Sequence, residues 1–278
     1  MIKIADGYEG LKSDFQARGI PTDSLGLRDH PMFLKAQDDD RAYLNKYAAF
    51  VVGRPYDADY LHHARTVITN VAGVLFDALK ANGRMGACVD MTGHFSRILE
   101  KEGVWSCGIK GSLALSFPVA SGEVSTHLWS VGCGGIVTGH AWLFAPPFSI
   151  VDVAIRQQAY GGNKRAYLAD VNLVEYPDLA DVEIEDVITP EARDELATSG
   201  VPRNLFFSTV APGMRDVLDI FPAHTCTSPQ GAVMKYCPMS VLATDSPLEI
   251  IRDLDRHGKT PYQTYQERFL NLPVTSVL

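Results

Sequence analysis

The chain has 278 residues, of which 46% are hydrophobic and 21% are charged, and its formal net charge is −8. This length and composition allow a large hydrophobic core, so the chain does not need disulfide bonds to fold. The charge balance is acidic and no basic stripe is present, which argues against a nucleic-acid partner, because such binding depends on clustered lysine and arginine side chains.

The N-terminal part of the chain has the pattern of helices. Apolar residues recur every three or four positions in residues 30–52 and again in residues 57–83, which is the period of an amphipathic helix. Asp57 or Asp59 can cap the start of the second segment, and Gly83 can close its end.

A further helix is expected from Cys88 onward. Cys88, Met91, Phe95 and Ile98 fall on one face of it, and Gly103 ends it in the position that a helix C-terminus favours. The sequence therefore begins with helices.

After Gly103 the pattern changes to that of strands. Six runs are rich in β-branched and aromatic residues and are separated by Gly, Pro and Ser: 104–119, 124–132, 135–144, 148–155, 166–176 and 182–188. Further along, we expect a short helix at 190–200, strands at 204–210 and 231–245, and a helix at 246–258. Helices first and strands afterwards favour an α+β fold over alternating βαβ units.

The cysteines indicate a reducing compartment. Their number is odd, and none belongs to a Cys-x-x-Cys pair of the kind that binds zinc. The N-terminus lacks a signal-peptide pattern, and no window approaches the roughly 18 apolar residues that cross a bilayer. We therefore expect a cytoplasmic protein with no membrane partner. The five cysteines are Cys88, Cys107, Cys133, Cys226 and Cys237.

Cys88 is the first candidate for a functional residue. A thiol in the first turn of a helix lies near unpaired backbone N–H groups and the positive end of the helix dipole, and both lower its pKa. The alternative is a small buried side chain on the apolar face that Cys88 shares with Met91 and Phe95. The position of Cys88 alone does not decide between the two.

A second stretch, "GHAWLFAPPFSIVDVAI", supplies possible partners. If residues 145–147 form the turn of a hairpin, residues whose numbers sum to 292 face each other, and His140 lies opposite Asp152. The β-carbons of facing residues are about 5 Å apart, and from this distance an aspartate can orient an imidazole through its ring N–H. An aspartate in an apolar strand also needs a partner, which His140 provides. The alternative is a structural contact without a catalytic role.

These segments resemble a known family. Three segments are similar to the transglutaminase-like branch of the papain-like cysteine protease superfamily: "RMGACVDMTGHFSRILEKEGVWSCGIKG", "GHAWLF" and "SIVDVA". Arylamine N-acetyltransferases have the same order of Cys, His and Asp with a similar spacing. The resemblance covers residues 82–155. It implies a papain-like core with Cys88 as the nucleophile, His140 as general base and acid, and Asp152 as the residue that orients His140.

Two further residues are candidates for the oxyanion or substrate-binding site. Papain-like peptidases have a glutamine a few residues before the cysteine, whereas this chain has Asn82 in that region. Asn82 can donate a hydrogen bond to an oxyanion, or it can be a helix C-cap residue. The backbone N–H of Cys88 is another candidate donor. Trp142 can wall a cleft or pack in the core.

The resemblance also divides the chain into three parts. They are an N-terminal helical segment at 1–58, a transglutaminase-like catalytic core at 59–155, and a region at 156–278 that is either an extension of the sheet or a second α/β subdomain. The sequence does not decide between the last two, and it does not define the oligomeric state.

The expected activity is that of a thiol enzyme. Cys88 attacks the carbonyl of an amide or related acyl group of a peptide, protein or small molecule, as in a thiol protease, a deamidase or a transglutaminase-like acyltransferase. No metal or organic cofactor is expected. Two alternatives are open: an acyltransferase that uses a CoA thioester, and a non-catalytic binding module that keeps the fold.

Overall fold

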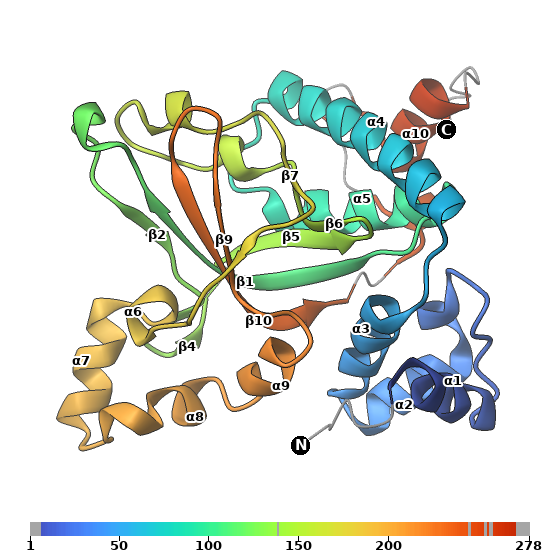
Figure 1. Ribbon diagram of the computed structural model, residues 1–278, viewed down its shortest axis with the longest axis horizontal. Coiled ribbons are helices and arrows are strands. Elements are labelled where there is room, and N and C mark those ends of the chain that lie inside the picture. The colour runs from blue at the N-terminus through green and yellow to red at the C-terminus, as the bar shows by residue number, and fades with distance from the viewer. Residues whose placement is uncertain (1–6, 138, 244–245, 253–254, 256–257, 271–278) are drawn as a thin grey trace.

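The computed structural model describes residues 7–137, 139–243, 246–252, 255 and 258–270. Helices come first along the chain, and an antiparallel sheet forms the centre of the molecule (Figure 1). The expected α+β class is therefore confirmed.

Ten α-helices and six short 3₁₀ helices lie in this part of the chain. The α-helices are α1 (Gly7–Ala17), α2 (Pro31–Asp39), α3 (Tyr43–Gly53), α4 (Ala58–Asn82), α5 (Cys88–Lys101), α6 (Ile184–Val187), α7 (Pro190–Thr198), α8 (Phe206–Val210), α9 (Met214–Leu218) and α10 (Pro261–Phe269). The 3₁₀ helices are η2 (Leu27–Asp29), η3 (Val119–Ser121), η4 (Ile155–Gln157), η5 (Lys164–Tyr167), η6 (Arg203–Leu205) and η7 (Leu248–Ile250).

The ends of α4 follow the expected capping signals. The Asp57 side chain accepts a hydrogen bond of 2.7 Å from the backbone N–H of Tyr60, and Gly83 has the left-handed conformation, with φ of 63°. Both features satisfy backbone groups that a helix end leaves unpaired. Of the two candidate caps, Asp57 is the one used.

The strands form one large sheet and a small two-stranded one. They are β1 (Cys107–Ser116), β2 (Thr126–Leu128), β3 (Val131–Gly132), β4 (Gly135–Ile136), β5 (His140–Ala145), β6 (Phe148–Asp152), β7 (Asn172–Val174), β8 (Asp178–Leu179), β9 (His224–Thr227) and β10 (Val233–Leu242). The large sheet has the order β7-β6-β5-β1-β10-β9-β8, with β2 paired to β1, and all its pairs are antiparallel.

The large sheet is curled, so that strands distant in its order meet across one face. The side-chain amide of Asn172 on β7 donates a hydrogen bond of 3.0 Å to the hydroxyl of Tyr236 on β10, and it contacts the sulfur of Cys226 on β9 at 3.4 Å. This curled face encloses buried side chains that include Leu113, Trp142 and Ile150.

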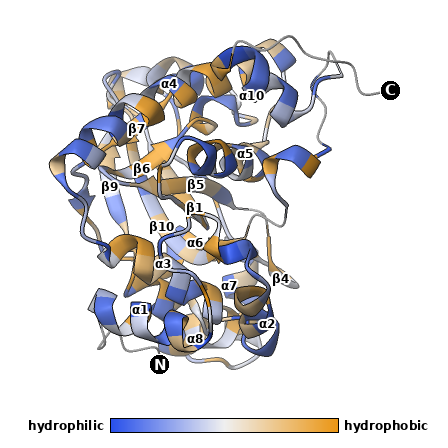
Figure 2. Ribbon diagram, turned by 90° about the vertical axis from the view of Figure 1, so that its right-hand side faces the viewer, coloured by the Kyte–Doolittle hydropathy of each residue, from blue (hydrophilic) through white to orange (hydrophobic). Residues whose placement is uncertain are grey.

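The opposite side of the sheet carries two helical groups. Helices α4 and α5 pack over β5 and share an apolar cluster with Ala141, Leu143 and Val151. Residues of α6 to α9 form another apolar cluster with Cys237 and Met239 of β10. Hydrophobic residues are concentrated on α3 and β6 in Figure 2, in keeping with their burial. No helix in the described ranges is both long and apolar enough to cross a membrane.

The C-terminal region contributes strands to the central sheet. Strands β7, β8, β9 and β10 all follow residue 156, and β10 pairs with β1 along almost its whole length. The division of the chain into three parts with boundaries at 58 and 155, and the character of residues 156–278 as a sheet extension or a subdomain, stay a prediction.

Two expected strands are helices instead. Residues 184–187 form α6, because Glu183 and Asp186 make a reciprocal capping box at its start. Residues 206–210 form α8, where Phe206 is buried in the cluster of α6 to α9. Short apolar runs do not distinguish a strand from a buried helix. Within the expected helix at 246–258 only η7 is formed among the described residues, and residues 253–254 and 256–257 lie outside them.

Candidate active site

Cys88 is the first residue of α5 and lies in the core. Gly86, two residues earlier, has a φ of 72°, a conformation that favours glycine, and its N–H donates a hydrogen bond of 2.9 Å to the carbonyl of Gln157. The residue at the helix N-cap, Ala87, makes no side-chain hydrogen bond. The first turn of α5 therefore presents backbone N–H groups without a side-chain cap beside the thiol.

The acidic residue of this first turn is engaged elsewhere. Asp90 pairs with the guanidinium of Arg84. A carboxylate near the thiol would oppose its ionisation, and the pairing with Arg84 partly neutralises that charge.

The hairpin that carries His140 and Asp152 has a different register from the expected one. Ala145 faces Phe148 across the turn Pro146-Pro147, whose peptide bond is cis, and Leu143 faces Val151. The numbers of facing residues therefore sum to 293 or 294, with an irregularity between them, and the predicted sum of 292 was wrong. In this register Asp152 lies diagonally across from His140 on the same face of the sheet. At such diagonal positions an aromatic side chain such as that of His140 can still reach its neighbour.

His140 and Asp152 nevertheless contact each other. Nε2 of His140 lies 2.6 Å from Oδ2 of Asp152, and neither side chain is exposed. Because an ionised carboxylate only accepts, Nε2–H of the imidazole is the donor. The other carboxylate oxygen, Oδ1, accepts a hydrogen bond of 3.0 Å from the N–H of Ala154. Asp152 thus fixes the orientation and tautomer of the imidazole.

Tyr236 is a further partner of Asp152 that the sequence did not reveal. Its hydroxyl donates a hydrogen bond of 3.0 Å to Oδ2 of Asp152 and accepts the one from Asn172. The three side chains form a buried chain of hydrogen bonds behind His140. A buried tyrosine in an apolar strand signals that its hydroxyl needs a partner, but the sequence does not show that β10 lies near Asp152.

The thiol of Cys88 interacts with the imidazole of His140. The second ring nitrogen, Nδ1, is buried and has no hydrogen-bond partner of regular geometry within the described residues. The thiol also interacts with the backbone N–H of Ala141. The structure therefore brings Cys88, His140 and Asp152 together in the predicted order.

The electrostatics of this arrangement favour a charged pair. Burial opposes ionisation of the Cys88 thiol, but the nearby imidazole of His140 and its charge outweigh burial and lower the pKa of the thiol. Burial likewise opposes the charged form of His140, but Asp152 and Cys88 outweigh it and raise the pKa of the imidazole to about 10. Both shifts stabilise a thiolate beside an imidazolium.

The other four cysteines behave in the opposite way. Burial raises the pKa of Cys107 and of Cys237 to about 12. It also raises the pKa of Cys226, and at Cys133 the pKa is raised by slight desolvation and by the neighbouring Glu195. Cys88 is therefore the cysteine whose thiolate the structure stabilises.

Asn82 and Trp142 occupy different places. Asn82 is the last residue of α4, whereas the C-cap itself is Gly83, and Asn82 lines a small pocket with Met91 and His94. Trp142 is buried in the core, where its ring lies 6.3 Å from that of His140 and 5.0 Å from that of Tyr236. Roles for these two residues in binding an oxyanion or substrate stay predictions.

The segment after β6 lies over the first turn of α5. Besides the bond from Gly86 to Gln157, Arg165 donates hydrogen bonds to the sulfur of Met85 and to the carbonyl of Gln158. Tyr160 is near enough to the site that the charges of Asp152 and Cys88 add to burial in raising its pKa. Cys88 is only 1% exposed as a result of this packing and of the core beneath it.

Within the described residues, no group of three or more His, Cys, Asp or Glu side chains is arranged to hold a metal ion. No protein-family model matches the chain, and neither a curated protein nor a solved structure matches it significantly. The resemblance to the transglutaminase-like branch therefore stays a prediction carried by the motifs and by the arrangement of the three residues.

Proposed function

We propose that the protein is a cysteine-nucleophile enzyme of the transglutaminase-like type, which forms an acyl-enzyme from an amide or related acyl substrate. The observation that carries the proposal is the lowered pKa of Cys88 beside a buried His140–Asp152 pair joined at 2.6 Å. A stabilised thiolate, a general acid and an orienting carboxylate are the groups that nucleophilic acyl transfer requires.

In the proposed reaction, the Cys88 thiolate attacks the carbonyl carbon and forms a sulfur–carbon bond. The tetrahedral intermediate then collapses, the bond to the leaving group breaks, and imidazolium His140 gives its proton to that group. In the second step neutral His140 takes a proton from the acceptor, which attacks the thioester and releases Cys88. Asp152 stabilises the imidazolium through both steps. The N–H groups at the start of α5 are the candidate donors to the oxyanion.

The acceptor decides the class of reaction. Water makes the enzyme a thiol protease or deamidase, whereas an amine makes it a transferase. An acyltransferase that takes its acyl group from a CoA thioester would use the same three residues in the same roles. All of these reactions pass through an acyl-Cys88 intermediate.

A second candidate is a non-catalytic binding module, and the burial of Cys88 favours it. A thiol that is 1% exposed cannot meet a substrate carbonyl unless neighbouring groups move. The enzyme proposal therefore requires that the segment around Gln157, Tyr160 and Arg165 shift away from the first turn of α5.

The two candidates differ in their response to an activated acyl donor. The protein is mixed with p-nitrophenyl acetate at neutral pH, quenched in acid and examined by intact-mass and peptide mass spectrometry. The enzyme proposal predicts one acetyl group on Cys88 that is absent in Cys88→Ser and strongly reduced in His140→Ala. If Cys88 is acetylated no faster than Cys133, the exposed cysteine, the result would support the binding module instead.

A further inference from the structure

A pocket of about 390 Å³ lies beside the C-terminal half of β10, beyond the residues that pair with β9, where α3 and α9 approach the strand. Its apolar wall includes Met214 and Val217 of α9 and Met239 of β10, and its polar groups include Arg41 and Lys110. This volume lies within the range of sites for small ligands, and a mainly apolar wall with a few polar groups is typical of them.

The two cations of this pocket have no counter-charge among the residues that the structure describes. The side chains of Arg41 and Lys110 make no ion pair or hydrogen bond with a described residue, and no acidic residue is among the described ones that line the pocket. In a chain with 33 acidic and 25 basic residues, a pocket with two unpaired cations and no carboxylate is suited to an anion that comes from outside.

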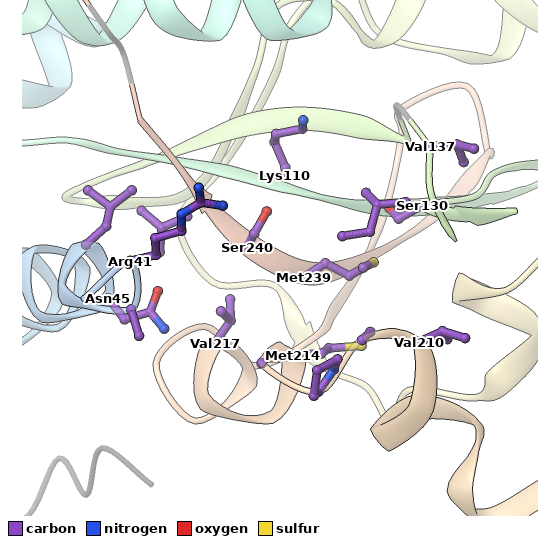
Figure 3. Close-up of a pocket in the computed structure, with 17 residues that line it drawn as sticks. Arg41, Asn45, Lys110, Ser130, Val137, Val210, Met214, Val217, Met239 and Ser240 are labelled. Carbon is purple, nitrogen blue, oxygen red and sulfur yellow. The ribbon is translucent and has the colours of Figure 1, made fainter. Parts of the chain in front are cut away.

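The polar groups of the pocket are directed to one side. In Figure 3 the side chains of Ser240 on β10 and Lys110 on β1 point upward, and Arg41 reaches toward them from the segment before α3, while Met214 and Val217 lie below β10. Lys110 and Ser240 are paired residues of β1 and β10, which places their side chains on the same face of the sheet. The pocket therefore has a cationic side and an apolar side.

The cationic side lies close to the candidate active site. Lys110 of β1 is paired with Ala141 of β5, so their β-carbons are about 5 Å apart on the same face. The N–H of Ala141 interacts with the Cys88 thiol, and both residues belong to the cluster under α5. Ala141 is thus a neighbour of both Lys110, its partner on β1, and the Cys88 thiol.

We propose that this pocket binds the anionic group of the acyl substrate that Cys88 attacks. Arg41 and Lys110 pair with a carboxylate or a comparable anion, and Met214, Val217 and Met239 contact the apolar part of the molecule next to it. The proposal rests on the proposed function, because it assigns the substrate of Cys88 to the class of anionic, amphipathic acyl compounds.

The test uses two alkylating probes of equal size. One is an iodoacetamide whose nitrogen carries a hexanoate chain, and the other is the corresponding hexanamide. The rates at which each modifies Cys88 are measured by peptide mass spectrometry, and their ratio is divided by the same ratio for glutathione. The ratio cancels any change in the intrinsic reactivity of Cys88.

The proposal predicts that the wild-type ratio favours the carboxylate probe. Lys110→Gln and Arg41→Gln should each lower it by about two- to fivefold, the effect expected of a partly exposed ion pair, and added salt should lower it in the wild type. The control is Arg268→Gln on α10, an exposed arginine outside the pocket, which should leave the ratio unchanged.

The two proposals fail in different ways. Rapid modification of Cys88 by the neutral probe, with a wild-type ratio equal to that of glutathione and no change in either variant, would overturn the substrate assignment while leaving the nucleophile intact. Cys88 that reacts with neither probe would overturn the proposed function, and the assignment would fall with it.

Discussion

Replacement of Asp152 by asparagine is the sharpest perturbation of the buried pair. Three donors converge on this carboxylate: Nε2–H of His140, the hydroxyl of Tyr236 and the N–H of Ala154. An asparagine has one acceptor oxygen and an NH₂ group that only donates, so at least one donor would face another donor. Leaving a buried polar group unsatisfied costs about 1–3 kcal/mol of folding free energy.

The effect on the thiol follows from the charge. Without the carboxylate, burial favours neutral His140, and Cys88 loses the imidazolium that stabilises its thiolate. The Asp152 charge by itself disfavours the thiolate, but this effect is smaller than the stabilisation by His140. We therefore expect the pKa of Cys88 to rise in Asp152→Asn, and each unit of rise above the working pH lowers the thiolate fraction about tenfold.

The assay is the rate of iodoacetamide modification of Cys88 at pH 7, followed by peptide mass spectrometry. Asp152→Asn should react at least about tenfold more slowly than the wild type, and urea unfolding should show the loss of stability. The control is Asp77→Asn, an exposed aspartate on α4, which should change neither. An Asp152→Asn protein that stays folded and reacts at the wild-type rate would refute the reasoning.

Two further substitutions test the packing around the pair, and a third serves as their control. Tyr236→Phe removes the hydrogen bond to Asp152 and the acceptor of the Asn172 amide, so it should cost about 1–3 kcal/mol in urea unfolding. Because the carboxylate stays, it should slow the thiol less than Asp152→Asn does, and a slower thiol than that of Asp152→Asn would contradict this order. Gly111→Ala would place a β-carbon 2.1 Å from the carbonyl oxygen of Cys237, and we expect a loss of about 2 kcal/mol or more. Gly73→Ala, with open space in the middle of α4, should instead gain about 0.5–1 kcal/mol; equal effects of the two alanines would contradict the clash.

The ends of α4 and the start of α5 could be predicted because the signals for them lie in adjacent residues. The cap at Asp57, the left-handed Gly83 and the start of α5 at Cys88 each depend on a few adjacent residues. Residues 206–210, in contrast, were predicted as a strand and form a helix. They carry no such local signal, and a short apolar run becomes a strand or a helix according to what it packs against.

The contact between His140 and Asp152 was predicted through a wrong register. The turn is one residue shorter than expected, and an irregularity follows between Leu143 and Ala145. Together they shift the pairing by two residues, and a shift of two keeps every side chain on its face, whereas a shift of one would have separated the pair. The contact was predicted correctly because a register error of two residues leaves His140 and Asp152 on the same face of the sheet.

The partners of Asp152 from other strands could not be predicted. Tyr236 is 84 residues away in the chain, and its approach depends on the pairing of β10 with β1 and on the curl that brings β7 toward it. The pairing of strands so distant in sequence is set by the packing of the whole core. The burial of Cys88 is likewise a property of the segment after β6, which carries no motif.

The pH dependence of Cys88 alkylation tests the central claim most directly. A lowered pKa keeps the thiolate at pH values at which a free thiol is protonated, and reactivity is lost only as the pH falls through the pKa of the folded state. Measured from pH 5 to 10, the rate at Cys88 should therefore stay substantial well below the ~8.5 of a free thiol, while Cys133 in the same molecules should rise only above that value. A Cys88 profile that follows that of Cys133 would contradict the thiolate–imidazolium pair and the activity proposed from it.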